Sequence, residues 1–280
     1  MTLQSALHTL PREWQDWVMH NLERSCEPEG MIDIMVRDGR FERQFARAAV
    51  EEARFGAPST EPVAIPDIDT SSNTVQTPDR RVNVVFSLKS PRIVVVGNLL
   101  SDDECDAMLA YTEQKLVRSP VVSDTDGSSA MHSHRTSRGA MLQRGETELV
   151  ARIEARLAAL MQWPVERGEG LQVLRYDHGN EYRPHYDWFN TEQPGPRKHL
   201  ERGGQRFGTI VMYLSDVEKG GGTSFPKLGL EVQPKKGGAV FFANVDRYGA
   251  PDENTLHAGE PVVSGVKYIA TKWVRERPYV

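Results

Sequence analysis

The sequence places two histidines, an aspartate and a lysine where they can form one metal-dependent site. His185 and Asp187 are two residues apart, and Lys267 follows His257 by ten residues. Two imidazoles and one carboxylate match the ligand set that binds non-haem Fe(II) on one face and leaves other metal positions open. A lysine near such a site can pair with the far carboxylate of a dicarboxylic acid cosubstrate. These residue types together predict an oxygenase.

The spacing of His185 and Asp187 suits two ligands on one strand. We expect a strand over residues 182–188, and side chains two residues apart on a strand point to the same face. A lone pair of this kind is a weak signal, and His199 with Glu201 offers similar chemistry elsewhere. That second pair lies among prolines, glycines and charges, where no strand would direct its side chains. We therefore expect the metal at His185 and Asp187.

A strand expected over residues 267–274 carries a lysine among apolar residues on each face. Lys267 shares one face with Trp273, and Lys272 lies on the other. A lysine that points into a core is costly unless an anion or a hydrogen-bond partner meets it. A bound carboxylate would meet Lys267; the alternative is an edge strand with Lys267 outward. His257, taken alone, would be an ordinary loop residue.

The elements that position these residues follow a change of pattern along the chain. Residues 1–56 have helical apolar stripes, and residues 57–80 form a proline-interrupted polar linker. Residues 81–280 are mixed: a capping box at 101–104 and an amphipathic helix at 149–161 precede many short strands. This order predicts an α+β fold, a double-stranded β-helix (jelly roll) braced by helices, after an N-terminal helical segment.

The helical stripes of residues 1–56 are predicted to be core, packed on one another or on the main domain. The alternative is a surface that binds a partner or forms a homodimer, with Trp14 and Trp17 as anchors. The sequence leaves both arrangements open.

Composition restricts the partners and the compartment. The net charge of −5 gives no basic footprint, so we expect neither nucleic acid nor an anionic membrane surface as a partner. The sequence contains no run near the 18 apolar residues of a membrane span and no secretory signal at its start. Cys26 and Cys105 are too few for a disulfide framework, and Cys105 is expected to be buried and inert. A cytoplasmic protein is predicted.

The chain resembles a known family over residues 88–278. The similar segments, in order, are 99–105, 135–139, 169–176, 182–187, 212–218, 221–226, 234–237 and 265–268. They resemble the catalytic domain of collagen-type prolyl 4-hydroxylases, within the Fe(II)/2-oxoglutarate-dependent dioxygenases. The family's secreted members have a partner subunit and more cysteines, so intracellular, stand-alone hydroxylation is the better fit here. Residues 1–80 have no part in the resemblance.

The resemblance implies a role for each matching residue. His185, Asp187 and His257 would bind Fe(II), and Lys267 would pair with the distal carboxylate of 2-oxoglutarate. Further residues are implied around the cosubstrate, namely Tyr176, Thr209 and Tyr213 as hydrogen-bond partners and Trp273 and Tyr182 as wall residues. The implied reaction consumes O2 and 2-oxoglutarate, forms succinate and hydroxylates an unactivated C–H bond, with ascorbate as an expected reductant.

The substrate stays open at this level. The leading hypothesis is a peptidyl proline, and the alternative is a free amino acid or another small molecule. Residues 120–138 and 190–206 read as long loops that serve either as lids over the site or as plain surface. A third hypothesis, of another class, is a non-catalytic binding module on the same scaffold; the complete set of His185, Asp187, His257 and Lys267 argues against it.

Overall fold

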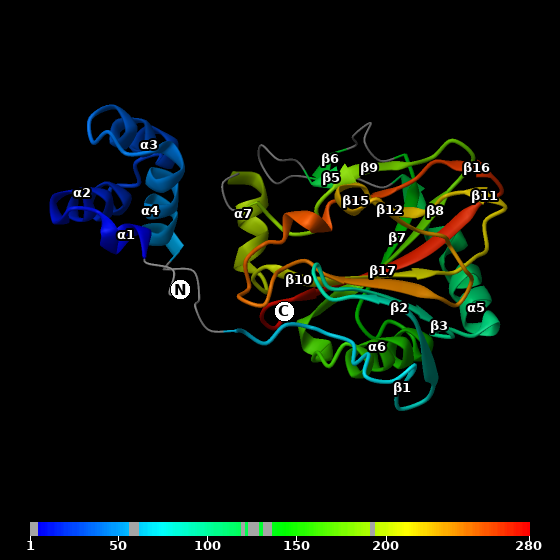
Figure 1. Cartoon of the computed structure of the whole chain (residues 1–280). Helices are drawn as coiled ribbons and strands as arrows, with labels where there is room; N and C mark the ends of the chain where they lie inside the picture. The colour runs from blue at the N-terminus through cyan, green and yellow to red at the C-terminus, as the bar shows by residue number, and fades with distance from the viewer. Residues whose placement is uncertain (1–4, 56–61, 119–120, 123–128, 131–135, 191–193) are drawn as a thin grey trace. The chain divides into compact units, whose positions relative to one another are not determined.

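A computed structural model gives the fold. It describes residues 5–55, 62–118, 121–122, 129–130, 136–190 and 194–280, and it divides the chain into two compact units, 1–63 and 64–280. Figure 1 shows both units, which we describe separately. Among the described helices, none is long and apolar enough to cross a membrane.

The first unit is a group of helices around its own small core. Its helices are α1 (Ala6–Thr9), α2 (Arg12–Glu23), α3 (Pro28–Arg37) and α4 (Arg43–Phe55). Val18, Met35 and Val50 are fully buried between them. Trp14 packs edge-on against Trp17 at 5.3 Å between ring centroids. The apolar stripes of this segment therefore pack on one another.

The second unit is built on a large antiparallel sheet faced by a smaller one. In spatial order, the strands of the large sheet are β1 (Thr74–Gln76), β2 (Arg81–Leu88), β3 (Ile93–Gly97), β14 (Ala239–Ala243), β10 (Arg206–Tyr213), β17 (Lys267–Arg275), β8 (Gly168–Tyr176), β7 (Arg138–Leu142) and β4 (Val117–Arg118). Those of the small sheet are β13 (Leu230–Val232), β12 (Thr223–Phe225), β15 (His257–Gly259) and β9 (Tyr182–His185). Two strand pairs are separate, β11 (Lys219–Gly220) with β16 (Val262–Ser264) and β5 (Val121–Val122) with β6 (Ser129–Ala130).

Helices brace the large sheet on the face away from the small one (Figure 1). The bracing helices are α5 (Asp102–Thr112) and α6 (Glu148–Leu160). Another helix, α7 (Pro194–Glu201), follows β9 in the sequence. Short 3-10 turns lie at Glu113–Lys115, Val165–Arg167, Pro226–Leu228 and Glu253–Thr255. The capping box expected at the start of α5 is present, because the Ser101 hydroxyl accepts from the Glu104 amide and the Glu104 carboxylate accepts from the Ser101 amide. The jelly roll braced by helices is confirmed.

The alternation of side chains along the central strands gives the large sheet two separate apolar layers. On β10, Ile210 and Met212 pack towards the helices, whereas Val211 packs in the layer between the two sheets. Phe225 and Val232 contribute to that second layer from the small sheet. The candidate site residues thus open into the space between two sheets whose positions are fixed by packing on both sides.

The stretch that sequence patterning assigned to a linker, residues 57–80, is partly integrated into the second unit. Residues 64–80 belong to that unit, and they include β1. Ile68 is fully buried in the layer beneath the large sheet. The Asp67 carboxylate forms an ion pair with Arg92 at 2.6 Å. Proline and short polar residues exclude a helix here, but they allow an extended segment that packs along the sheet.

Strand β17 carries two buried lysines in two different environments. Lys272 points to the helix side, where its ammonium group contacts the Glu154 carboxylate of α6 and the Glu169 carbonyl oxygen. The side chains of Lys272 and Glu154 are 3% and 2% exposed, so water screens neither charge. Lys267 lies on the opposite face, between the sheets, and is 1% exposed. Among the described residues, Lys272 has an ion-pair partner and Lys267 has none.

The buried pair leads to a stability prediction. Lys272→Met leaves the Glu154 carboxylate buried without its counter-charge, which costs about 3 kcal/mol. We expect the thermal midpoint of the full chain to fall by about 6–12 °C. The double variant Glu154→Leu/Lys272→Met should recover part of that loss, because no buried charge remains. Circular dichroism measures the thermal midpoint of each variant. An equal fall of the midpoint in the single and the double variant would contradict this account.

Candidate active site

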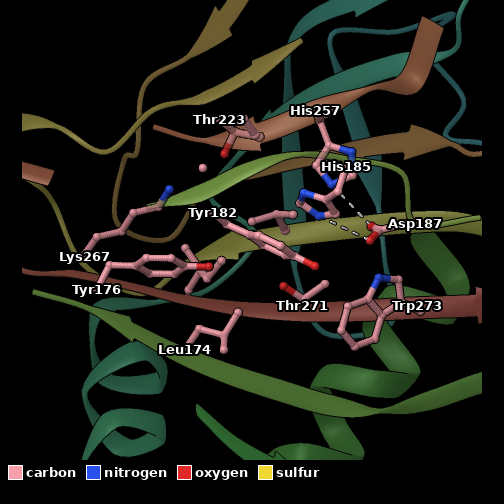
Figure 2. A pocket seen from close by; sticks show the side chains of 14 residues that line it. Leu174, Tyr176, Tyr182, His185, Asp187, Thr223, His257, Lys267, Thr271 and Trp273 are labelled. Atoms are coloured by element: carbon pink, nitrogen blue, oxygen red, sulfur yellow. Dashed lines mark ion pairs between the residues drawn. The ribbon is translucent and has the colours of Figure 1, made fainter. Parts of the chain in front are cut away.

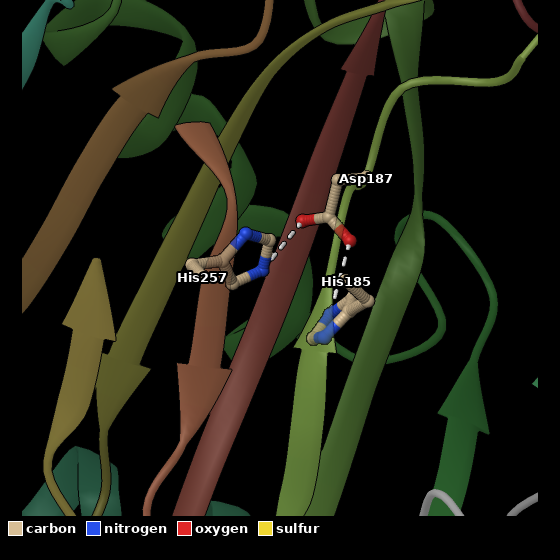
Figure 3. Close-up of side chains that lie close together, drawn as sticks. All are labelled: His185, Asp187 and His257. Carbon is tan, nitrogen blue, oxygen red and sulfur yellow. Dashed lines mark ion pairs between the residues drawn. The ribbon is translucent and has the colours of Figure 1, made fainter. Parts of the chain in front are cut away.

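His185, Asp187 and His257 converge on one point between the two sheets (Figure 3). The Nε2 atom of His185 lies 3.7 Å from Asp187 Oδ1, and that of His257 lies 3.6 Å from Asp187 Oδ2. Within the described part of the chain these three form the one group of its kind that could hold a metal ion, with ligand atoms within 4.8 Å of one another. Two imidazole nitrogens and a carboxylate oxygen suit Fe(II).

Strand pairing brings the two histidines together from distant parts of the sequence. His257 begins β15 and lies directly opposite His185 at the end of β9. Asp187 follows two residues after β9 has ended, so its position comes from a bend and not from the alternation of one continuous strand, which the sequence had suggested. His257 also lies in a strand, although its polar surroundings in the sequence suggested a loop.

Hydrogen bonds on the far side of each ring select the nitrogen that faces the site. His185 Nδ1 lies 2.8 Å from the Arg183 carbonyl oxygen, and His257 Nδ1 lies 2.9 Å from that of Thr255. A carbonyl oxygen only accepts, so each Nδ1 carries the proton. In the neutral ring the lone pair is then on Nε2, the nitrogen that faces Asp187, and this is the form that binds a metal.

The Asp187 carboxyl group is buried and ionised. Burial alone would raise its pKa, but the nearby His257, His185 and Arg206 and the hydroxyl group of Thr209 hold the pKa at about 2. Its side chain is only 6% exposed. The site thus keeps a dry negative charge at neutral pH, which favours binding of a cation.

A cavity extends from this triad to Lys267 (Figure 2). Its walls include apolar side chains of the large sheet, such as Leu174, Val211 and Ile269. Lys267 reaches in from β17, and its Nζ donates to the Gly222 carbonyl oxygen at 3.4 Å. No carboxylate lies within 4 Å of this ammonium group among the described residues. The pocket therefore has a metal-type ligand set at one end and, at the other, a buried lysine without an ion-pair partner among the described residues.

The surroundings of Lys267 weaken its hold on the proton. Burial lowers the pKa of Lys267 to about 8, although the negative charges of Glu260 and Glu231 act in the opposite direction. A carboxylate bound against Lys267 would stabilise the charged form. The side chain is therefore suited to a ligand that carries negative charge.

The other residues expected around the cosubstrate divide into two groups. Tyr176 lines the cavity directly opposite Lys267 in the pairing of β8 with β17, and the Lys267 Nζ lies 5.4 Å from its ring centre. Thr209 and Tyr213 are not among the residues that line the cavity. Thr209 lies behind the triad, where its hydroxyl donates to Asp187 Oδ2 at 2.8 Å. Tyr213 donates to the Thr223 hydroxyl oxygen at 2.9 Å.

Thr223 is a cavity residue to which sequence reasoning gave no role. It lies on β12, lines the pocket and accepts a hydrogen bond from the Tyr213 hydroxyl, so its own hydroxyl hydrogen can point into the pocket. The segment that contains it, residues 221–226, was among those that resemble the known family, which was a usable signal. Sequence reasoning assigned the threonine role to Thr209 instead.

Two aromatic side chains form further walls. The Tyr182 ring stacks on the His185 imidazole at 3.6 Å between centroids. Trp273 lines the cavity, and the Arg206 guanidinium lies 4.1 Å from its ring centre on the other side. The indole Nε1 of Trp273 is buried without a hydrogen-bond partner in the described structure. Both expected wall residues thus border the site.

The competing pair, His199 and Glu201, does not belong to the triad. His199 and Glu201 belong to helix α7, so residues 190–206 are not an irregular loop; residues 191–193 are outside the described structure. The His199 ring stacks on Phe189 at 5.3 Å, and this pair is not part of the triad. Most of the other expected loop, residues 120–138, also lies outside the described residues.

The sequence matches the model of the 2OG-Fe(II) oxygenase superfamily over residues 171–275, the range that contains the triad and Lys267. It is 39% identical to the probable prolyl 4-hydroxylase 6 of Arabidopsis thaliana over 68% of this chain and 71% of the relative. It is 41% identical to the prolyl 4-hydroxylase 5 of the same plant over 65% of this chain and 68% of the relative.

A solved structure is similar in fold to about two thirds of this chain. The viral collagen prolyl hydroxylase of Paramecium bursaria Chlorella virus-1, solved as a complex with 2-oxoglutarate, aligns with a TM-score of 0.51 and 30% identity. The alignment covers 65% of this chain and 95% of the viral one. The superfamily uses Fe(II), 2-oxoglutarate and O2. The chain belongs to the prolyl 4-hydroxylase family of 2-oxoglutarate- and Fe(II)-dependent oxygenases.

Proposed function

We propose that His185, Asp187 and His257 hold the Fe(II) of a hydroxylase that acts on peptidyl proline. The observation that carries this proposal is the convergence of two Nε2 atoms and one buried carboxylate at the end of a cavity that leads to Lys267. The donor set fits Fe(II), since imidazole and carboxylate ligands on one face leave positions for a cosubstrate and O2. Bound Fe(II), 2-oxoglutarate and O2 would supply oxidative decarboxylation to succinate together with C–H hydroxylation.

The residues of the chain bind and orient the cosubstrate in this proposal. The Lys267 ammonium group pairs with the distal carboxylate of 2-oxoglutarate, and the Thr223 and Tyr176 hydroxyl groups donate to the same carboxylate. The length of the cavity between Lys267 and the triad then directs the keto acid end towards the metal ligands. The apolar walls keep water away, which strengthens these charge interactions.

The proline substrate follows from the relatives. Curated relatives near 40% identity are named prolyl 4-hydroxylases, and the viral neighbour is a collagen prolyl hydroxylase. The Tyr182 ring lines the cavity and stacks on the His185 imidazole beside the triad, and a flat aromatic face suits a pyrrolidine ring. Ascorbate is proposed as the reductant that keeps the iron in the ferrous state.

We further propose that the protein works in a reducing compartment, as the cytoplasm is. Cys26 and Cys105 are both free thiols. Burial raises the pKa of the Cys105 thiol to about 11, so it stays protonated and inert. The fold thus needs no disulfide among the described residues, which suits a compartment that keeps thiols reduced.

The metal assignment predicts a selective loss of turnover. His185→Ala should lower 2-oxoglutarate-dependent succinate production to background, because the metal loses one of its three ligands. His199→Ala is the matched control and should retain activity within about twofold, since that ring packs on Phe189 in helix α7. Succinate formed with Fe(II) and ascorbate measures both variants. Full succinate production by His185→Ala would contradict the assignment.

The buried lysine predicts a pH dependence for the cosubstrate. The pKa of Lys267 is about 8 in the free protein, so the KM for 2-oxoglutarate should be flat below pH 8. Above it, the neutral amine no longer attracts the carboxylate, and the KM should rise by up to about tenfold per pH unit. Lys267→Met should have a high KM that no longer depends on pH in this range. A KM that is independent of pH in the unmutated enzyme would exclude this role.

The substrate class can be tested directly by mass spectrometry. Proline-rich peptides incubated with the enzyme, Fe(II), 2-oxoglutarate and ascorbate should gain one oxygen atom on proline. Free proline under the same conditions is the comparison. Turnover of free proline without any oxygenated peptide would favour a small-molecule hydroxylase, while oxygenated peptide supports the proposal.

A further inference from the structure

A buried polar chain lies behind the triad, on the side away from the cavity. The Asn244 amide nitrogen donates to the Thr209 hydroxyl oxygen at 3.0 Å, and the Thr209 hydroxyl donates to Asp187 Oδ2 at 2.8 Å. Both Thr209 and Asn244 are 0% exposed. Thr209 lies in the middle of β10, and Asn244 directly follows β14, its neighbour in the sheet.

The direction of this chain is fixed by its chemistry. A hydroxyl group has one proton, and an ionised carboxylate only accepts, so Thr209 must donate to Asp187. Its oxygen can then accept from Asn244, whose amide nitrogen is the donor on the other side. The hydrogen bond from Asn244 polarises the Thr209 hydroxyl group, which strengthens the hydrogen bond that Thr209 donates to one carboxylate oxygen of Asp187. Asp187 Oδ1 accepts no hydrogen bond from the residues that the structure describes.

Separate contacts hold the main chain around Asp187. The Arg206 guanidinium lies 3.5 Å from the Asp187 carbonyl oxygen. The Gln205 side chain accepts from the Phe189 amide at 2.7 Å and donates to the Phe189 carbonyl oxygen at 2.8 Å. With the backbone fixed in this way, the remaining freedom of Asp187 is the rotation of its carboxylate. Among the described residues, Thr209 is the side chain that donates a hydrogen bond to this carboxylate, and it therefore restrains the rotation.

We propose that Thr209, oriented by Asn244, is a positioning residue that engages Oδ2 of Asp187 and presents Oδ1 to the metal. A carboxylate held in this way would bind a metal through one oxygen and leave other positions open for 2-oxoglutarate and O2. Without the hydroxyl group, the carboxylate is free to rotate away from the metal or to take a second position on it. This inference rests on the proposed metal assignment to His185, Asp187 and His257.

The test compares Thr209→Val with Thr209→Ser. Valine keeps the shape of threonine but cannot donate to Asp187, whereas serine keeps the hydroxyl group. The measurement is the Kd of Mn(II), obtained by titration of the full chain without cosubstrate or O2, so that it does not depend on turnover. Loss of a hydrogen bond to a metal ligand weakens metal affinity by about 10–100-fold. We expect at least a tenfold rise in Kd for Thr209→Val and a change within about twofold for Thr209→Ser.

Two controls separate positioning from general stability. Thr112→Val removes another buried threonine hydroxyl, in helix α5, where it donates to the Met108 carbonyl oxygen at 2.8 Å. It should lower the melting temperature without a change in the Kd of Mn(II). The visible absorption of the Co(II)-loaded protein reports the ligand arrangement; it should change in Thr209→Val and stay as in the unmutated protein in Thr209→Ser.

The possible outcomes separate the two levels of the proposal. If His185→Ala abolishes Mn(II) binding and Thr209→Val leaves the Kd unchanged, the metal site stands and the role of Thr209 is overturned. A serine variant as weak as the valine variant, or an equal loss in Thr112→Val, overturns it as well. If His185→Ala still binds Mn(II) at full strength, the metal assignment itself fails.

Discussion

The site depends on one register between two short antiparallel strands. β9 and β15 pair so that His185 lies opposite His257. This pairing sets the distance between the two imidazoles that the proposed metal site needs. A shift by one residue would turn one histidine to the other face of the small sheet, because side chains alternate along a strand. Packing against the large sheet supports the register, since the centroids of the Phe242 ring and the His257 imidazole are 4.6 Å apart. The packing of the two sheets thus determines the geometry of the proposed metal centre.

The second constraint is electrostatic and comes from strand β17. Its two buried lysines show what a lysine needs in a protein core: Lys272 contacts the Glu154 carboxylate inside the fold, whereas Lys267 faces a cavity. A buried cation without a counter-charge is unfavourable, so the fold retains at Lys267 a cost that a bound carboxylate can offset. The buried charge of Lys267 is thus matched by the negative charge of 2-oxoglutarate, the cosubstrate that the family uses.

Much of the fold and of the candidate site could be predicted from local patterns. Alternation predicted the strand of Lys267 and Lys272, and the capping box predicted the start of α5, because both signals depend on neighbours in sequence. Strand β15 was missed since its three residues carry no periodic signal, and its partner β9 is distant in sequence. Thr209 was expected beside the carboxylate of the cosubstrate. Its position on β10 was predictable, but its contact with Asp187 depends on the bend that follows β9. Tertiary packing, which no local pattern encodes, decides such contacts.

The central claim is that the triad and Lys267 belong to one site that binds a metal and 2-oxoglutarate together. Calorimetric titration of 2-oxoglutarate into the full chain, with and without Mn(II) and in the absence of O2, tests this claim most directly. The account predicts one molecule bound per chain and an affinity that falls by at least about tenfold when the metal is removed, since the keto acid end then loses its partner. Equal affinity with and without Mn(II), or no binding in either case, would contradict it.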